Sequence, residues 1–169
     1  LSVSGTSANL AEGTVVTVTL NGKNYTATTA ADGTWSLTVP AADLAGLGQA
    51  NYTLNATATN GVGNSVSNTA NLLVDTALPT VTINAVAGDN VINAAEVAAG
   101  QTLSGTVANA EAGNTVTVTI GGNSYTATVQ NDLTWSVNVP SDVLTALGNG
   151  SLSVTATVTN GHGNTGTGE

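Results

Sequence analysis

Apolar and polar residues alternate in short runs along this chain, which is the pattern of half-buried β-strands. Residues 16–20 alternate in this way, and so do residues 52–59. The pair Asn21-Gly22 separates the first run from a partner run at 24–28, and it predicts a β-hairpin because both residues tolerate positive φ. Residues 65–74 are the last predicted strand of this stretch. The pattern therefore predicts an all-β fold.

The same pattern returns after 100 residues without a gap. Self-similarity at a fixed spacing indicates tandem folding units. A unit of this length with about seven short strands has the size of an immunoglobulin-like β-sandwich with Greek-key connections. In that topology the chain enters at one end and leaves at the other, so we expect two sandwiches stacked end to end. The landmarks that repeat are Tyr25 and Tyr125, Trp35 and Trp135, Pro40 and Pro140, and Asn60-Gly61 and Asn160-Gly161.

Two units follow from the repeat, residues 1–75 and residues 76–169, and the linker begins at Asp75. The first unit has no copy of residues 81–100, so its N-terminal strand region is missing, and the second stops before its last strand would pair. No signal peptide, initiator Met or apolar run of membrane-spanning length occurs. We therefore expect Leu1 to lie inside a longer protein.

Charge narrows the classes of function. The chain has one lysine, Lys23, no arginine and ten carboxylates, which gives a net charge of −9. Binding to nucleic acid needs Lys and Arg side chains that displace counterions from phosphates, so it is excluded. An anionic membrane surface would also repel this chain, and we expect no membrane insertion. The acidic surface is either simply solvated or a site for divalent cations.

One group of calcium ligands is predicted in a single loop. Asp89, Asn90, Asn93 and Glu96 offer carboxylate and amide oxygens within eight residues, and calcium takes six to eight oxygen ligands. The spacing is not that of an EF-hand. Asn93 to Glu96 also fits a capping box that opens one helical turn, and both interpretations stay open. In a sandwich, this loop lies at the end where the chain leaves the second unit and would face a third one.

A second group is predicted around the linker. If the second unit is a sandwich, the loops with Glu111 and Asp132 lie at the end where the chain enters, beside Asp75. A calcium ion shared by Asp75, Glu111 and Asp132 would offset the repulsion between these carboxylates. In the alternative interpretation, Asp75 begins the turn before Pro79 and Asp132 occupies a hairpin turn, as Asp commonly does.

The aromatic residues fit packing better than ligand binding. Trp35 and Trp135 lie on alternating strands, so we expect each in a core with its N–H hydrogen-bonded, rather than as a platform for sugars. His162 is the only histidine and lies in a Gly-rich loop without a predicted nucleophile or carboxylate beside it. Neither a zinc-ligand set nor a phosphate-binding glycine motif is present. We expect no enzymatic activity.

Threonines repeat on one face of the predicted strands. They could order water at an ice surface if the face is flat and exposed, but Thr also suits the solvent face of any strand. The residues concerned are Thr17, Thr19, Thr115, Thr117 and Thr119.

Three motifs carry a resemblance to a known family. They are Asp75-Thr76-x-x-Pro79, Gly88-Asp89-Asn90-x-Ile92-Asn93-x-x-Glu96, and Asp32-Gly33-Thr34-Trp35. Together with the rest of the chain they resemble the bacterial Ig-like repeats of giant type I-secreted adhesins, the biofilm-associated and repeats-in-toxin-like proteins. The resemblance implies an extracellular, surface-tethered stalk with calcium ions that rigidify the junctions between modules. Leu133 replaces the glycine of the third motif, so calcium ligation at this turn can differ between the units.

The resulting hypothesis is a structural spacer of a secreted, cell-surface adhesin that supports cell adhesion and biofilm formation. Its expected partners are neighbouring Ig-like modules of the same chain, with a host-cell or abiotic surface bound through other regions. The alternatives are a glycan- or host-protein-binding Ig-like module, and a module that binds ice or another surface through its threonine ladders.

Overall fold

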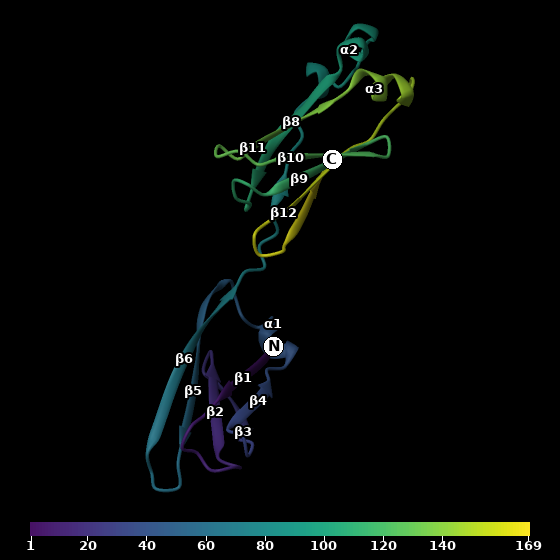
Figure 1. The fold of residues 1–169 in the computed structure, drawn as a ribbon. Coiled ribbons are helices and arrows are strands. Elements are labelled where there is room, and N and C mark those ends of the chain that lie inside the picture. The colour runs from purple at the N-terminus through teal and green to yellow at the C-terminus, as the bar shows by residue number, and fades with distance from the viewer. The chain divides into compact units, whose positions relative to one another are not determined.

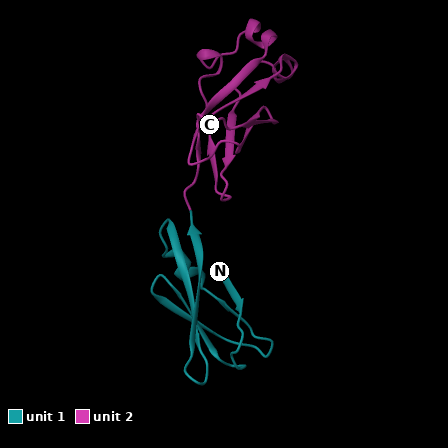
Figure 2. Ribbon diagram, turned by 60° about the vertical axis from the view of Figure 1, so that its left-hand side comes forward, with its two compact units in different colours: residues 1–75 teal, residues 76–169 magenta.

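The computed structural model describes all residues from Leu1 to Glu169 and divides them into two compact units, Leu1–Asp75 and Thr76–Glu169 (Figure 2). Both consist of antiparallel strands joined by short turns (Figure 1). This confirms the predicted all-β sandwich class. None of the helices has the length and apolar character that crossing a membrane requires.

Unit 1 has six strands and one short helix. β1 pairs only with β4, and the second sheet has the order β3-β2-β5-β6. The prediction of about seven strands is wrong for this unit by one, because residues 1–75 contain no copy of the strand that opens unit 2. The elements are β1 (Ser2–Thr6), β2 (Val15–Leu20), β3 (Lys23–Thr28), β4 (Thr34–Thr38), α1 (Ala41–Ala45), β5 (Ala50–Thr59) and β6 (Ser65–Val74).

Unit 2 has seven strands and repeats the arrangement of unit 1. Its sheets have the orders β11-β8-β7 and β10-β9-β12-β13. The elements are β7 (Thr80–Val81), η1 (Val86–Gly88), α2 (Ala94–Ala99), β8 (Gln101–Ala108), β9 (Thr115–Ile120), β10 (Asn123–Thr128), β11 (Thr134–Val139), α3 (Ser141–Leu147), β12 (Val154–Thr159) and β13 (Thr165–Gly168). β8 therefore corresponds to β1, and β13 to the first part of β6.

The predicted hairpin turn is present between β2 and β3. Asn21 and Gly22 both have positive φ, 49° and 78°, and Leu20 pairs with Lys23 directly across the turn. Two consecutive residues with positive φ match the right-handed twist of the flanking strands. The register set here places Val16 and Val18 on the buried face and leaves the intervening threonine on the other.

The two tryptophans differ in burial. Trp135 is 1% exposed and belongs to the apolar core of unit 2, as predicted. Trp35, at the same place in unit 1, is only half-buried. The expectation that the indole N–H is hydrogen-bonded is wrong for Trp135, because its Nε1 is buried among apolar neighbours without a partner.

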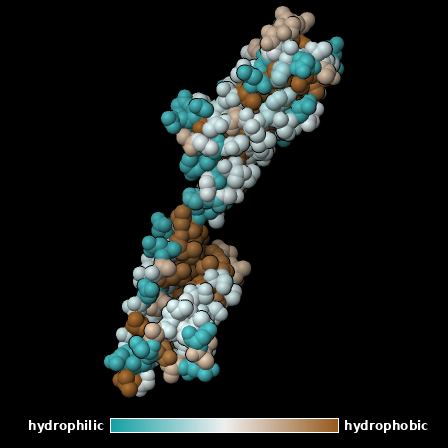
Figure 3. Space-filling model, viewed as in Figure 1, coloured by the Kyte–Doolittle hydropathy of each residue, from teal (hydrophilic) through white to brown (hydrophobic).

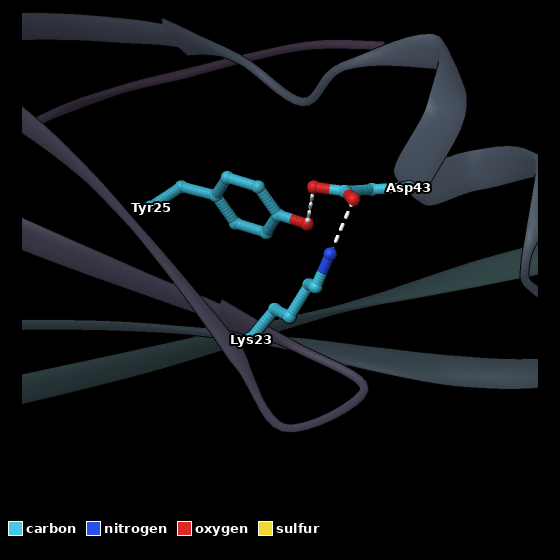
Figure 4. A network of polar contacts seen from close by, with 3 residues as sticks. All are labelled: Lys23, Tyr25 and Asp43. Carbon is cyan, nitrogen blue, oxygen red and sulfur yellow. Dashed lines mark hydrogen bonds and ion pairs between the residues drawn. The ribbon is translucent and has the colours of Figure 1, made fainter.

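A polar network ties α1 to β3 in unit 1 (Figure 4). Asp43, in α1, accepts hydrogen bonds from the Lys23 ammonium and from the Tyr25 hydroxyl, the latter at 2.8 Å. Lys23, followed by Tyr25, lowers the pKa of the Asp43 carboxyl. Unit 2 has Asn123 and Val143 in place of Lys23 and Asp43, so this network is specific to unit 1.

We expect acid to remove the contribution of this network to stability. Because the pKa of Asp43 in the folded chain lies below its ordinary value of 3.8, the contribution is complete above that pH and is lost as the pH falls through the folded-state value. The variant Asp43→Asn should therefore be less stable than the parent chain near neutral pH, and this difference should shrink in acid. Thermal unfolding of both chains from about pH 6 to about pH 2 measures it. A difference that stays constant with pH would contradict the prediction.

Candidate metal-binding loops

The loop between β7 and α2 contains four of the predicted calcium ligands, and the first two hold the loop to itself. Asn90 has a φ of 64°, and its Oδ1 accepts a hydrogen bond from Val86 N at 2.9 Å. Asp89 Oδ1 accepts from Val91 N, also at 2.9 Å. Asn and Asp side chains commonly close turns in this way. Both side chains are exposed.

The other two predicted ligands form a capping box at the start of α2. Asn93 Oδ1 accepts from Ala95 N at 3.0 Å and from Glu96 N at 3.2 Å. In return, Glu96 Oε2 accepts from Asn93 N at 2.8 Å. These bonds satisfy backbone donors that have no partner inside the helix. The capping-box alternative from the sequence is thus present.

Calcium ligation by this loop stays a prediction. The hydrogen bonds engage one oxygen of each carboxylate, Asp89 Oδ1 and Glu96 Oε2. A calcium site needs more oxygen ligands than these two carboxylates supply. Nowhere in the chain do three His, Cys, Asp or Glu side chains gather in a way that could hold a metal ion. The loop fits calcium only as part of a larger ligand set.

We expect Asn93→Ala to destabilise unit 2 by about 1 kcal/mol, because α2 loses its N-cap. The measurement is chemical unfolding of the parent and the variant in the presence of a chelator, so that capping alone is tested. Asn149→Ala, which removes an exposed amide from another loop of unit 2, is the control and should cost much less. A repeat in excess calcium separates the two roles of Asn93, since a loss that grows with calcium indicates ligation. An unchanged stability in chelator would contradict the capping role.

Glu111 and Asp132 lie in separate loops of unit 2 and both accept local hydrogen bonds. Glu111 Oε2 accepts from Gly161 N at 3.2 Å. Asp132 Oδ1 accepts from Thr134 N at 3.1 Å and from Thr134 Oγ1 at 2.7 Å. The Thr134 hydroxyl, followed by its amide, lowers the pKa of the Asp132 carboxyl. The turn interpretation of Asp132 therefore has a direct structural basis.

Unit 1 makes the same turn without the second group of predicted ligands. Asp32 Oδ1 accepts from Thr34 N at 3.0 Å and from Thr34 Oγ1 at 2.7 Å, and these bonds lower the pKa of the Asp32 carboxyl. The residue after the aspartate has positive φ in both units, 82° for Gly33 and 63° for Leu133. The turn geometry thus survives the loss of the glycine, although leucine rarely adopts this conformation.

Asp75 closes unit 1 directly after β6 and is half-buried. A site shared by Asp75, Glu111 and Asp132 stays a prediction.

The sequence analysis missed one residue that organises a loop of unit 2. Asn160 is 6% exposed, and its Oδ1 accepts from His162 N at 3.1 Å and from Asn164 N at 3.0 Å. Its Nδ2 donates to Asn109 O at 3.4 Å, which joins two loops of the unit. Asn60 Oδ1 accepts the corresponding bonds in unit 1. The repeated Asn-Gly pair was the available signal, and it marks a structural loop.

Comparison with solved structures identifies several similar chains. One is a 1.5-MDa bacterial ice-binding adhesin described for its retention on the host cell surface, with 30% identity, 99% of this chain and 55% of that chain covered, and a TM-score of 0.61. Another is a Ca²⁺-stabilised adhesin that helps an Antarctic bacterium to reach out and bind ice, with 36% identity, coverage of 99% and 42%, and a TM-score of 0.60. This chain thus spans about half of each.

A third similar structure is a bacterial immunoglobulin-like domain from the ice-binding adhesin of M. primoryensis. It is 39% identical, with 54% of this chain and 91% of that chain covered and a TM-score of 0.44. No curated protein sequence matches this chain. The family model for the bacterial Ig-like domain matches residues 4–76. The resemblance inferred from the sequence motifs is confirmed: the chain belongs to the family of bacterial Ig-like domains.

Proposed function

We propose that this chain is a structural segment of the stalk of an extracellular bacterial adhesin, tethered at the cell surface and holding other modules away from it. The observation that carries the proposal is the tandem arrangement of two small β-sandwiches with a shared sequence pattern, in a chain similar to Ig-like adhesin structures. Such an array sets length and stiffness. Its partners are neighbouring Ig-like modules of the same polypeptide, and support of cell adhesion and biofilm formation follows from this role.

Calcium is the proposed ligand that stiffens this segment. One similar adhesin is described as Ca²⁺-stabilised. The net charge of −9 supports the same idea, because a bound cation offsets repulsion between carboxylates. The proposed ligands are the two groups from the sequence, Asp89, Asn90, Asn93 and Glu96 in one group and Asp75, Glu111 and Asp132 in the other.

Thermal unfolding with and without calcium tests this role. A cation that binds only the folded chain stabilises it by about 1.4 kcal/mol at ten times its dissociation constant, so the melting temperature should rise with calcium and fall again with chelator. The paired variants Asp89→Asn with Glu96→Gln, and Asp75→Asn with Asp132→Asn, assign the effect to one group. Asp142→Asn removes an acid outside both groups and is the charge control. Identical melting curves in calcium and in chelator would rule out the cation.

The alternatives receive less support from side-chain environment. A platform for glycans needs exposed aromatic rings, and Trp135 is 1% exposed. An ice-binding face needs regularly exposed threonines, but Thr17, Thr117 and Thr119 are half-buried. The Thr19 hydroxyl also donates to Asn24 Oδ1 at 2.7 Å within the sheet. A stalk segment requires neither feature, and for it we expect no enzymatic activity.

A further inference from the structure

The sheets of unit 1 leave an apolar groove open between them. The groove has a volume of about 840 Å³ and is lined by side chains of both sheets, among them Val3, Trp35, Leu54, Ala56 and Val66. In the view of Figure 3, unit 1 exposes a broad hydrophobic area. Val66 is 57% exposed although it is apolar. An apolar groove of this size on a small domain indicates a surface that another chain covers.

The wall of this groove is the inner face of β6. Cross-strand partners in an antiparallel sheet project to the same face. Val66 pairs with Ala58, and Ala70 pairs with Leu54. Val16 and Val18, which are buried, lie on the same face through the pairing of Val16 with Ala58. Val66 and Ala70 therefore point to the side on which unit 1 has its core, yet both are exposed.

Unit 2 shows what fills the corresponding place. β7 pairs with β8 through Val81 and Val107, and the chain continues along β8 with hydrogen bonds from Thr82 N to Thr106 O and from Asn84 N to Ser104 O, both 2.8 Å. On its other side β7 lies against β13, where its backbone contacts Gly166. Val81 is 5% exposed there.

The two units differ at the two edges that a strand would join. β8 lies between β11 and β7, whereas β1 pairs with β4 alone and has an open edge. An open edge presents unpaired backbone donors and acceptors to an added strand. Gly166 of unit 2 is replaced by Val66 in unit 1. An added strand in unit 1 must therefore pack on the side chain of Val66 instead of passing close to a glycine.

We propose that the groove of unit 1 binds an extended strand of the β7 type, supplied by another repeat of the same sequence. The strand has the alternating pattern of residues 79–84, pairs with the open edge of β1 and packs its apolar side chains on Trp35 and Val66. This site is independent of the calcium groups. It gives the repeats a way to associate by strand addition, in which the backbone supplies affinity and the alternating side chains supply specificity.

The test uses the full chain and a synthetic peptide of residues 77–87. We expect the peptide to shift the amide NMR signals of β1 and β6. It should also reduce the quenching of tryptophan fluorescence by acrylamide, because Trp35 becomes covered while Trp135 is 1% exposed from the start. The same peptide with Val81→Asn and Ile83→Asn is the control and should not bind. Shifts confined to β8 and β13 would show exchange with β7 of unit 2 and would overturn the proposal.

Two variants of the chain test the position of the strand. Val66→Asp should lower the affinity for the peptide about tenfold, which corresponds to about 1.4 kcal/mol. Its effect on the unbound chain should be small, because the side chain is 57% exposed. Ser67→Asp places the same charge on the opposite face of β6 and should leave the affinity unchanged. Equal affinities for the two variants would overturn the proposed packing on Val66.

A covalent version of the experiment removes the dependence on peptide affinity. A copy of residues 77–100 is joined directly before Leu1, because Leu1 corresponds to Gln101 in the repeat. We expect the extended chain to melt at a higher temperature than the parent, with amide protection appearing at β1. An extension with Val81→Asn and Ile83→Asn should lose this gain. If neither the peptide nor the extension changes the signals of β1 and β6, the proposal is wrong.

Discussion

Replacing Trp135 by alanine should destabilise unit 2 by about 3–5 kcal/mol, the usual cost of removing a large aromatic side chain from a packed core. Trp135 is 1% exposed and contributes to one cluster with Leu103, Val118 and Val139. The cavity left behind loses both the burial of the ring and the contacts of its neighbours. Since the chain has two units, unfolding should be followed through the amide NMR signals of unit 2 in increasing denaturant.

The matched control for this substitution is Trp35→Ala. Trp35 occupies the same place in unit 1 but is half-buried, so we expect a loss of about 1–2 kcal/mol there. The comparison tests whether burial, and not the identity of the residue, sets the cost. Equal losses in the two units would contradict this explanation.

The second large effect is expected for Gly105→Val. A Cβ at Gly105 would overlap the carbonyl of Thr82 and would lie 2.9 Å from Cζ2 of Trp135. The carbonyl belongs to the backbone that runs beside β8, so it cannot rotate away. We expect a loss of about 3 kcal/mol, the upper part of the usual range for overpacking, although valine favours strands more than glycine does. Hydrogen exchange should also show loss of protection at the amide of Thr82, which bonds Thr106 O at 2.8 Å.

Gly61→Ala is the control for steric overlap. No atom lies within 4 Å of a Cβ built at Gly61, and its φ is not in the left-handed region. We expect a change within about 0.5 kcal/mol, as for most surface substitutions. If Gly105→Val costs no more than this, β7 does not pack against β8 as described.

The local structure was predictable where one short stretch of sequence decides it. Asn21 and Gly22 form a two-residue turn because both accept positive φ, and the alternation from Val16 to Leu20 then fixes which side chains face the core. The helical turn expected after Pro140 is present as α3. These features need no information from distant parts of the chain.

Features that depend on distant partners could not be predicted in the same way. Trp35 and Trp135 have almost the same local sequence, but only Trp135 has β7 in its sheet, two strands away. The bond between Lys23 and Asp43 joins residues twenty positions apart, and no sequence period announces it. For Asn93 and Glu96 the difficulty is chemical, because capping and metal ligation use the same side-chain oxygens.

The pairing of Lys23 with Asp43 bears on how the protein tolerates salinity. Since Lys23 is the only lysine and there is no arginine, the chain can form no second attraction between such a cation and a carboxylate. Dissolved ions screen exposed charges within about 3 Å at 1 M salt. In brine the fold therefore loses one weak attraction and is relieved of the mutual repulsion of its remaining acids. A polypeptide of this make-up is suited to ion-rich water and has little electrostatic stability to lose there.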